Sequence, residues 1–350
     1  MIETKQRTSL ANIDFDPRYQ RAAENAIRTC LRVQAGERAT LITDQETKQI
    51  AASLYAELVR AGADVHAFVV EDYAVRPMAH MPQDILADLE KADVSIYCMQ
   101  GQHNELQTRK EMMGVINRVK PRHAHMVNIN HEIMLEGMQA DFLAVDAISK
   151  SVIALAKKAK KIVAKSGAGT EIEATFSPEL NWLKTSGIIS REKWGNLPGG
   201  EVLTCPENVN GVYVVDGVVG DYLCAKYGDL KATPLKIHIK DSRITHCECE
   251  NKELLEEFLQ YTHTDENSDR VGEFAIGTNI GVQDVRGLIL QDEKIPGMHI
   301  AFGYPYCEHT GATWKSVTHI DVVGRDFDIW IDDQKIMEHG KFLIEPEMAR

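Results

Sequence analysis

Apolar residues follow two different patterns along the chain, and the change falls near residue 165. Before that point, stripes of apolar residues at helical spacing alternate with short continuous apolar runs. The stripes predict helices over residues 17–34, 50–61, 82–91, 105–119, 131–137 and 145–161, and the runs predict strands over 39–43, 65–70, 93–99 and 125–129. Such alternation is typical of a parallel sheet with helices on both faces, so we expect a doubly wound α/β domain over residues 1–165.

After the small-residue stretch 165–169, short strands separated by Gly, Pro and Asp turns replace the helices. We expect strands over residues 202–204, 212–215, 235–240 and 326–331, and one helix over 252–260. This spacing is typical of an antiparallel sheet or a partly closed barrel. The sequence therefore predicts a second, β-rich (α+β) domain over residues 166–350.

The loop Gln100-Gly101-Gln102-His103 directly follows the predicted strand over residues 93–99. Open α/β sheets often bind ligands at this edge, but we favour the interpretation of a plain polar connection. No G-x-G-x-x-G or P-loop pattern follows any strand of this half, so a nucleotide site is not indicated.

The charge balance narrows the range of partners. Asp and Glu outnumber Lys and Arg by 52 to 39, which gives a formal charge of −13 and argues against nucleic acid or an anionic membrane surface. No apolar run approaches the ~20 residues that a membrane-spanning helix needs. Residues 1–6 are polar and do not resemble a signal peptide, so we expect a cytoplasmic protein.

Seven cysteines form an odd set, which predicts reduced thiols. Cys247 and Cys249 are two residues apart and could indicate a site for a soft metal. No second pair of Cys or His stands at zinc-finger spacing, which favours two strand thiols of which one is buried.

Two glutamates stand where an apolar strand would bury them. Glu201 follows the turn Pro198-Gly199-Gly200 and begins an apolar run, and Glu273 lies among the small and apolar residues of 271–279. A buried carboxylate is unstable unless it is paired or bound to a metal, so each glutamate requires a partner. Exposure at the rim of a turn is the competing interpretation for Glu201, and a surface position is the competing one for Glu273.

Two histidines and an aspartate lie on apolar strands further along the chain. His299 interrupts the run 298–306, where a hydrogen-bonded core histidine is the competing interpretation. His319 and Asp321 are two residues apart, so on a strand their side chains point to the same face and can share one ion. A simple hydrogen bond between the two side chains would also explain this pattern.

Together these candidates offer three carboxylates and two imidazoles, all within the β-rich half. Five ligands exceed what one tetrahedral zinc ion needs. They suit two ions about 3.5–4 Å apart with a bridging carboxylate, for which we choose Glu273. Such ions lower the pKa of a bound water and polarise a carbonyl group. Zinc, cobalt, manganese and magnesium all tolerate these ligands, so residues 166–350 are expected to form the catalytic domain with an unspecified divalent metal.

Several motifs of the β-rich half occur in the order typical of one enzyme family. They are Gly169-Thr170 through Phe176, Asn196 through Glu201, Gly272-Glu273-Phe274 through Asn279, His299-x-Ala301-x-Gly303 followed by Tyr306, and His319-x-Asp321. In these motifs the chain resembles the aminopeptidase T family of metallo-exopeptidases. The resemblance covers the C-terminal half well and the N-terminal half only in general character.

The resemblance implies a set of metal ligands, namely Glu201, Glu273, His299, Tyr306, His319 and Asp321. It implies that the Tyr306 phenol either ligates a metal or donates a hydrogen bond to the tetrahedral intermediate. Tyr304 is only two residues away, and the choice of Tyr306 follows the family spacing. The resemblance further implies a homodimer with an internal active-site cavity and a peptide or small-molecule substrate recognised by its α-amino group. The chain is shorter than typical members, chiefly before the motifs, and its segment 306–319 is compact.

A more distant resemblance points to the iron-dependent 2,5-dihydroxypyridine dioxygenases, which hold a single iron with two histidines and one carboxylate. His319 and Asp321 match the end of that triad, but Glu273 stands where those enzymes are expected to carry a histidine. We therefore predict a metal-dependent hydrolase of the aminopeptidase type. A non-haem Fe(II) ring-opening dioxygenase acting on a small hydroxylated N-heterocycle is the alternative. A metal-stabilised binding protein, recognised by a site with no open coordination position, is the third hypothesis.

Overall fold

The computed structural model describes residues 7–102 and 104–346, and their contacts divide them into two units. The first unit reaches Leu143 and includes Gly187–Gly199, and the second contains Ala144–Ser186 and the chain from Gly200 onward. Residue 165, where we expect the boundary between two domains, lies in a strand of the second unit. The domain boundary itself stays a prediction.

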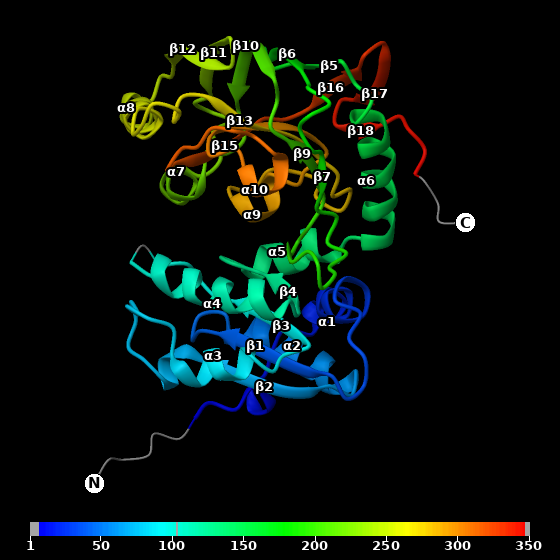
Figure 1. Ribbon diagram of the computed structural model, residues 1–350, viewed down its shortest axis with the longest axis vertical. Coiled ribbons are helices and arrows are strands. Elements are labelled where there is room, and N and C mark those ends of the chain that lie inside the picture. Colours follow the sequence, from blue (N-terminus) through cyan, green and yellow to red (C-terminus); the bar gives the residue numbers. More distant parts are fainter. Residues whose placement is uncertain (1–6, 103, 347–350) are drawn as a thin grey trace. The chain divides into compact units, whose positions relative to one another are not determined.

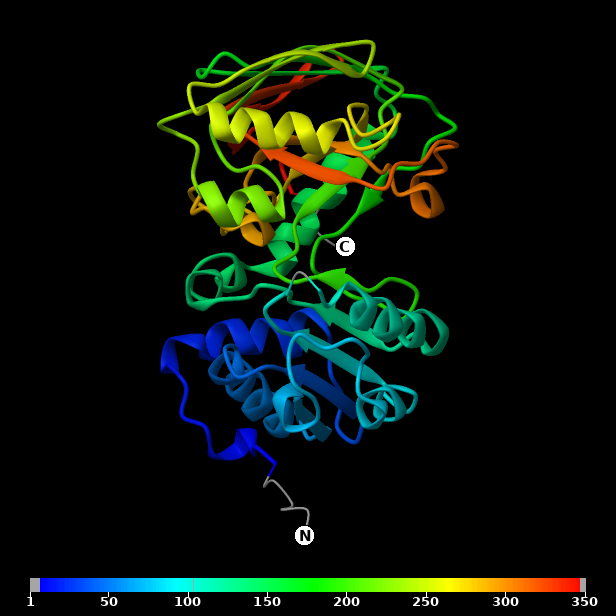
Figure 2. The ribbon, with the colours of Figure 1, turned by 90° about the vertical axis from the view of Figure 1, so that its left-hand side faces the viewer.

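The first unit is built on a parallel five-stranded sheet in the order β2-β1-β3-β4-β8 (Figure 1). Its strands are β1 (Arg38–Thr43), β2 (Asp64–Val69), β3 (Val94–Cys98), β4 (Arg122–His125) and β8 (Gly195–Asn196). Its main helices are α1 (Gln20–Glu24), α2 (Lys48–Arg60), α3 (Gln83–Leu89), α4 (Leu106–Val119) and α5 (His131–Leu135). Helices cover both faces of this sheet, as the alternating pattern predicts (Figure 2).

Most predicted elements of this unit are confirmed, but two boundaries are wrong. The first helical segment ends at Cys30 as a π-helix instead of reaching residue 34, because Arg32 adopts a positive φ of 50°. The fourth strand covers Arg122–His125 rather than 125–129, and Asn128, with a φ of 59°, interrupts the apolar segment that suggested the later position.

The second unit contains two antiparallel sheets (Figure 1). The eight-stranded sheet runs β12 (Arg243–Glu248), β11 (Leu235–Lys240), β10 (Asn208–Val215), β6 (Glu171–Thr175), β5 (Lys161–Ser166), β16 (Phe327–Ile331), β17 (Gln334–Glu338) and β18 (Lys341–Phe342). The five-stranded sheet runs β15 (His319–Val323), β14 (Gly297–Gly303), β13 (Val271–Gly277), β9 (Glu201–Thr204) and β7 (Leu183–Lys184). The antiparallel, β-rich character predicted for this half is confirmed.

Helices border these sheets at several points. They are α6 (Phe142–Ala156), α7 (Asp221–Tyr227), α8 (Lys252–Thr262), α9 (Ile289–Asp292) and α10 (Cys307–Thr310). Only α8 is predicted within the second half of the sequence, because the other helices after residue 166 have four to seven residues and show no helical stripe. Helix α6 ends at Ala156 rather than 161, since Lys161 begins strand β5. None of the described helices is both long and apolar enough to cross a membrane.

One apolar core lies between the two antiparallel sheets. Phe274, Ile300 and Phe302 of the five-stranded sheet belong to the same buried cluster as Ile162 and Tyr213 of the eight-stranded sheet. Because side chains alternate along a strand, the neighbouring residues of β13 and β14 point to the opposite face of the five-stranded sheet. That opposite face carries the polar residues singled out in the sequence.

Candidate metal centre

Four adjacent strands of the five-stranded sheet place five polar side chains on one face. These are Glu201 on β9, Glu273 on β13, His299 on β14, and His319 and Asp321 on β15. Across the sheet, most of their direct partners are small: Glu201 faces Gly277, Glu273 and Asp321 both face Ala301, His319 faces Gly303, and His299 faces Ala275 on one side and Val323 on the other. Directly opposed residues of antiparallel strands share a face, so the small partners leave space into which the polar side chains extend.

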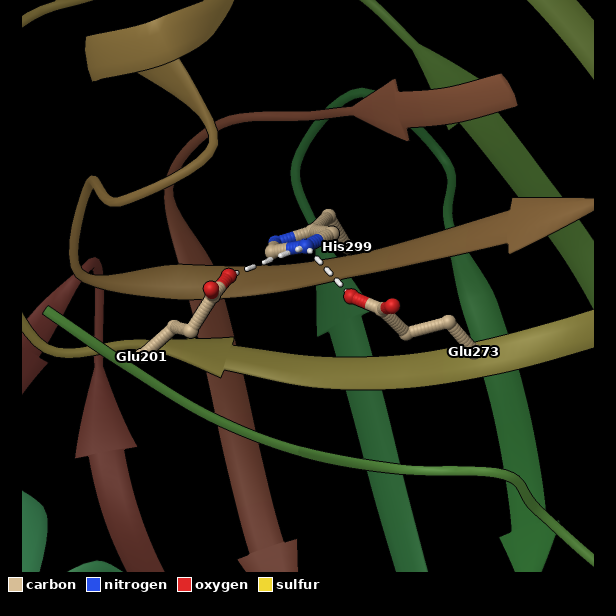
Figure 3. Close-up of side chains that lie close together, drawn as sticks. All are labelled: Glu201, Glu273 and His299. Atoms are coloured by element: carbon tan, nitrogen blue, oxygen red, sulfur yellow. Dashed lines mark ion pairs between the residues drawn. The ribbon is translucent and has the colours of Figure 1, made fainter. Parts of the chain in front are cut away.

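His299 lies at the middle of this group and has three carboxylates around one ring nitrogen. Figure 3 shows two of them, those of Glu201 and Glu273, directed toward the ring. Its Nε2 is 3.4 Å from Glu273 Oε1, 3.7 Å from Glu201 Oε2 and 3.9 Å from Asp321 Oδ1. The side chain is 2% exposed, and Nε2 makes no hydrogen bond to any described residue. A buried polar atom in this state is costly, so Nε2 requires a partner that the described residues do not supply.

His319 is oriented by a backbone contact. Its Nδ1 donates a hydrogen bond of 2.9 Å to the carbonyl oxygen of Tyr304, which can only accept. Nε2 therefore faces the carboxylates, 3.5 Å from Asp321 Oδ2 and 3.9 Å from Glu273 Oε2. A histidine whose second nitrogen is held by a carbonyl group is the usual arrangement of a metal ligand.

The spacing of these atoms fits divalent cations better than hydrogen bonds. Separations of 3.4–3.9 Å exceed the range of about 2.7–3.2 Å for good hydrogen bonds. Ligand atoms bound at about 2.0–2.2 Å to one tetrahedral ion stand roughly 3.3–3.6 Å apart. Ligand atoms of Glu201, Glu273 and His299 all lie within 4.8 Å of one another. Buried carboxylates and imidazoles at this spacing are a donor set suited to a divalent metal.

The electrostatics of the group also favour a cation. Burial alone would lower the pKa of His319, but the carboxylates of Asp321 and Glu273 outweigh it and raise the pKa to about 10. Burial likewise opposes ionisation of Asp321, yet His319 lowers its pKa to about 2. The carboxylates also raise the pKa of His299 against the effect of burial. Protons on the histidines thus balance the carboxylates, and a bound cation would replace those protons.

Tyr306 lies beside this group at the start of α10. Its ring meets the ring of His319 edge to face, with centroids 4.9 Å apart. Burial, and then the charges of Glu273 and Asp321, raise the pKa of the phenol well above its usual value. Tyr304, the alternative two residues earlier, instead donates its hydroxyl to Glu308. Both phenols therefore keep their protons at neutral pH, and the phenol of Tyr306 is the one that lies next to the candidate ligands.

The structure adds three residues that the sequence analysis missed. Lys294 is 1% exposed, and its Nζ lies 2.9 Å from Glu201 Oε1 while it also pairs with Glu293. Thr185 donates its hydroxyl to the same Oε1 at 2.9 Å. Burial raises the pKa of Glu293 to about 8. In the sequence, the charged run Asp292-Glu293-Lys294 near Pro296 is typical of an exposed turn, and no pattern marks Glu293 or Lys294 as buried.

The two other candidate sites gain no support from the described residues. In the loop after β3, the backbone N–H of Gln100 donates a hydrogen bond to Asp44, and Arg76 joins Asp44 to Glu105, so this edge of the sheet is held by internal ion pairs. His103 of that loop lies outside the described residues. Cys247 and Cys249 are both buried, which corrects the expectation that one is exposed, and all seven cysteines are free.

A sheet face that gathers two imidazoles and three carboxylates defines a candidate metal-dependent enzyme. The chain belongs to the thermophilic metalloprotease family M29, whose model matches residues 144–342. It is therefore a metal-dependent peptidase, and the resemblance to the aminopeptidase T family stated from its motifs is confirmed. No curated protein matches the sequence.

Two solved structures share the fold over nearly the whole chain. A 2,5-dihydroxypyridine dioxygenase from Pseudomonas putida KT2440 has a TM-score of 0.68 and 16% identity, covering 97% of this chain and 99% of its own. AmpT from Thermus thermophilus has a TM-score of 0.67 and 17% identity, covering 93% and 99%. At such low identity the likeness establishes a mixed α/β fold with parallel and antiparallel sheets, and the family match favours the peptidase chemistry over the dioxygenase chemistry.

Proposed function

We propose that this peptidase is an aminopeptidase with two divalent cations in its active site. The proposed ligands are Glu201, Glu273, His299, His319 and Asp321, with Tyr306 beside them. The observation that carries the proposal is the position of Glu273, whose Oε1 is 3.4 Å from His299 Nε2 and whose Oε2 is 3.9 Å from His319 Nε2. A carboxylate between two imidazoles suits a bridge between ions about 3.5–4 Å apart.

When bound, the cations would supply Lewis acidity, polarising the scissile carbonyl group and lowering the pKa of water. The chain contributes the geometry around them. Glu273 sets the spacing of the two positions, and the Tyr304 carbonyl group fixes the ring of His319. The protonated phenol of Tyr306 donates a hydrogen bond to the substrate oxygen as negative charge develops there.

Hydrolysis of simple anilides tests the proposed activity. The metal-free protein is reconstituted separately with zinc, cobalt, manganese and magnesium, and offered aminoacyl-p-nitroanilides and their N-acetylated counterparts. We expect release of nitroaniline only from substrates with a free α-amino group. Inactivity against every anilide with all four metals would contradict the proposal, and equal cleavage of the acetylated compounds would make the enzyme a peptidase of another type.

The dioxygenase remains the second candidate, because its structure has the fold of this chain and because His319 and Asp321 could end an iron triad. Glu201 and Glu273 weigh against it, since a facial triad needs one carboxylate rather than three. Oxygen consumption by the Fe(II)-loaded protein with 2,5-dihydroxypyridine distinguishes the two. The peptidase proposal expects no uptake above that of free Fe(II).

We also propose a homodimer in the cytoplasm. Seven free cysteines suit a reducing compartment, and the family resemblance implies the dimer. Sedimentation equilibrium should give about twice the chain mass of 39.2 kDa. A single species at the mass of one chain over the whole concentration range would show a monomer instead.

A further inference from the structure

The two cation positions of the proposed centre have matched donors. One position has the carboxylate of Glu201 and the imidazole of His299, and the other has the carboxylate of Asp321 and the imidazole of His319. Glu273 is shared between them, with one oxygen toward each histidine. Donor type alone would therefore give both positions similar affinity for the same ion.

Lys294 breaks this equivalence. Its ammonium group lies 2.9 Å from Glu201 Oε1 and also contacts Glu293, whereas no described lysine or arginine forms an ion pair with Asp321. The lysine is nearly fully buried, so water screens its charge little. An ammonium group and a cation that share one carboxylate compete for its negative charge, and they also repel each other.

The local backbone holds Lys294 in this place. Gly277 is the cross-strand partner of Glu201, and a Cβ atom at Gly277 would collide with the carbonyl oxygen of Ile295. The segment 294–295 therefore packs directly against the strand position opposite Glu201. Asn279 adds a backbone hydrogen bond of 2.9 Å to the carbonyl oxygen of Lys294. The ammonium group is thus part of a close-packed turn and not the end of a freely moving surface side chain.

Glu201 keeps one oxygen for a cation in this arrangement. Glu201 Oε1 pairs with the ammonium group of Lys294 and accepts a hydrogen bond from the hydroxyl group of Thr185, each at 2.9 Å. The other oxygen, Oε2, lies 3.7 Å from His299 Nε2. We propose that Lys294 is a positioning residue that makes Glu201 a ligand through one oxygen and makes the cation position at Glu201 and His299 the weaker of the two. This inference rests on the two-cation centre proposed above.

The proposal predicts unequal, stepwise binding of metal. Zinc is titrated calorimetrically into the metal-free protein, and the zinc retained after dialysis is counted by mass spectrometry. Wild type should bind one ion tightly and a second at least about ten-fold more weakly. Glu201→Gln should abolish the weak step, and Asp321→Asn the strong one. Equal steps in wild type, or loss of the strong step in Glu201→Gln, would overturn the assignment.

Substitutions of Lys294 and Thr185 separate charge from orientation. Lys294→Met removes the ammonium group but leaves the hydrogen bond from Thr185 to Oε1. The weakly bound zinc ion should therefore bind about ten-fold more tightly, which is the size of effect that substitutions next to metal ligands have. Lys294→Arg retains the charge and should keep the wild-type difference. Thr185→Val keeps the charge of Lys294 but removes the hydroxyl group that orients Glu201, so the second zinc ion should bind even more weakly than in wild type.

A lysine that only stabilises the fold would lower the melting temperature of Lys294→Met without tightening either step, and that result would overturn the proposal. If Lys294→Met does not fold without metal, the wild-type and Lys294→Arg titrations still decide, because both must show two unequal steps. Failure to bind zinc at all would instead contradict the proposed metal centre itself.

Discussion

At the scale of single residues, the candidate centre depends on charges that are buried together. Glu201, Glu273, His299 and Lys294 are each less than 7% exposed. Like charges at this spacing repel unless protons or cations balance them. The raised pKa values of both histidines show that protons fulfil this role in the absence of metal. Metal uptake should therefore weaken as the pH falls.

Glu273 is the residue on which the centre depends most. Replacing it with Gln removes the charge of the shared carboxylate but keeps its volume. We expect activity to fall by at least about 10²-fold, because substitutions outside the ligand shell already cost 10–100-fold. Metal content after dialysis should fall as well. Glu256→Gln changes an exposed glutamate of the same unit and should alter neither; full activity in Glu273→Gln would remove this residue from the site.

Tyr306 offers a test of how the reaction is assisted. Tyr306→Phe should lower kcat by about 10²–10³-fold, the usual effect of losing one donor to a developing negative charge. KM and metal content should stay near the wild-type values, since the hydroxyl group acts mainly in the transition state. Tyr304→Phe is the matched control, because that hydroxyl group points to Glu308. A larger effect in Tyr304→Phe would reverse the assignment of the two tyrosines.

The proximity of the five candidate ligands could be predicted because charged side chains stand out within apolar strands. His319 and Asp321 are two residues apart, and their shared face follows from strand geometry alone. Lys294 and Thr185 could not be found in this way. No apolar periodicity marks them: the packing of a turn against Gly277 brings Lys294 to Glu201, and the pairing of β7 with β9 brings Thr185, the residue after β7, to the same glutamate.

At the scale of secondary-structure elements, the strands determine the site and the short helices only border it. Elements with a long apolar pattern, such as α2 and α4, were predictable to within a few residues. The errors occur where one backbone angle overrides the pattern, as at Arg32 and Asn128. Helix α10, which begins directly after Tyr306, spans only four residues and has no periodicity to detect.

The turn before β9 positions Glu201 and tolerates little change. Gly200 has a φ of 135°, and a Cβ atom there would lie 2.6 Å from Cβ of Asn279. Gly200→Ala should therefore lower the free energy of unfolding by about 2–4 kcal/mol, combining backbone strain with overpacking. The urea midpoint measures this change. Gly167→Ala is the control, because nothing lies within 4 Å of a Cβ atom there, and its free energy of unfolding should stay within about 0.5 kcal/mol of the wild-type value. Equal midpoints for the two variants would contradict the strain expected at residue 200.

Strand β4 carries a buried histidine pair that should make the protein sensitive to acid. His123 Nδ1 contacts Ser95, its Nε2 is 3.3 Å from His125, and the His125 ring stacks on Tyr97. Burial lowers the pKa of His123 well below its usual value and that of His125 to about 3, with Arg109 adding to the second effect.

The sign of this dependence follows from proton uptake by the unfolded chain. Below about pH 6.5 the two histidines are protonated in the unfolded chain but stay neutral in the folded protein. The free energy of unfolding therefore keeps its full value above that pH and falls as the pH decreases toward the folded pKa values. The slope contributed by two protons is about 2.7 kcal/mol per pH unit. Urea unfolding between pH 7 and pH 5 measures it. His125→Gln should roughly halve this contribution, and an unchanged slope would exclude the pair as its source.

At the scale of the whole molecule, the fold alone does not decide the chemistry. A dioxygenase and AmpT have nearly equal TM-scores to this chain, 0.68 and 0.67. Function is carried by the residues placed on a fold, and here the family match covers residues 144–342, which include every proposed ligand. The sequence could predict the change from parallel to antiparallel architecture, because helical stripes disappear near residue 165. It could not place the segment Gly187–Gly199, which joins the first unit through β8.

The location of bound metal tests the central claim most directly. Crystals of the zinc-loaded protein, measured on both sides of the zinc absorption edge, give anomalous difference peaks only where zinc is bound. We predict two peaks, one on each side of Glu273, with ligand distances of about 2.0–2.3 Å to Glu201 and His299 at one and to His319 and Asp321 at the other. Ordered zinc elsewhere, with no peak beside Glu273, would contradict the account.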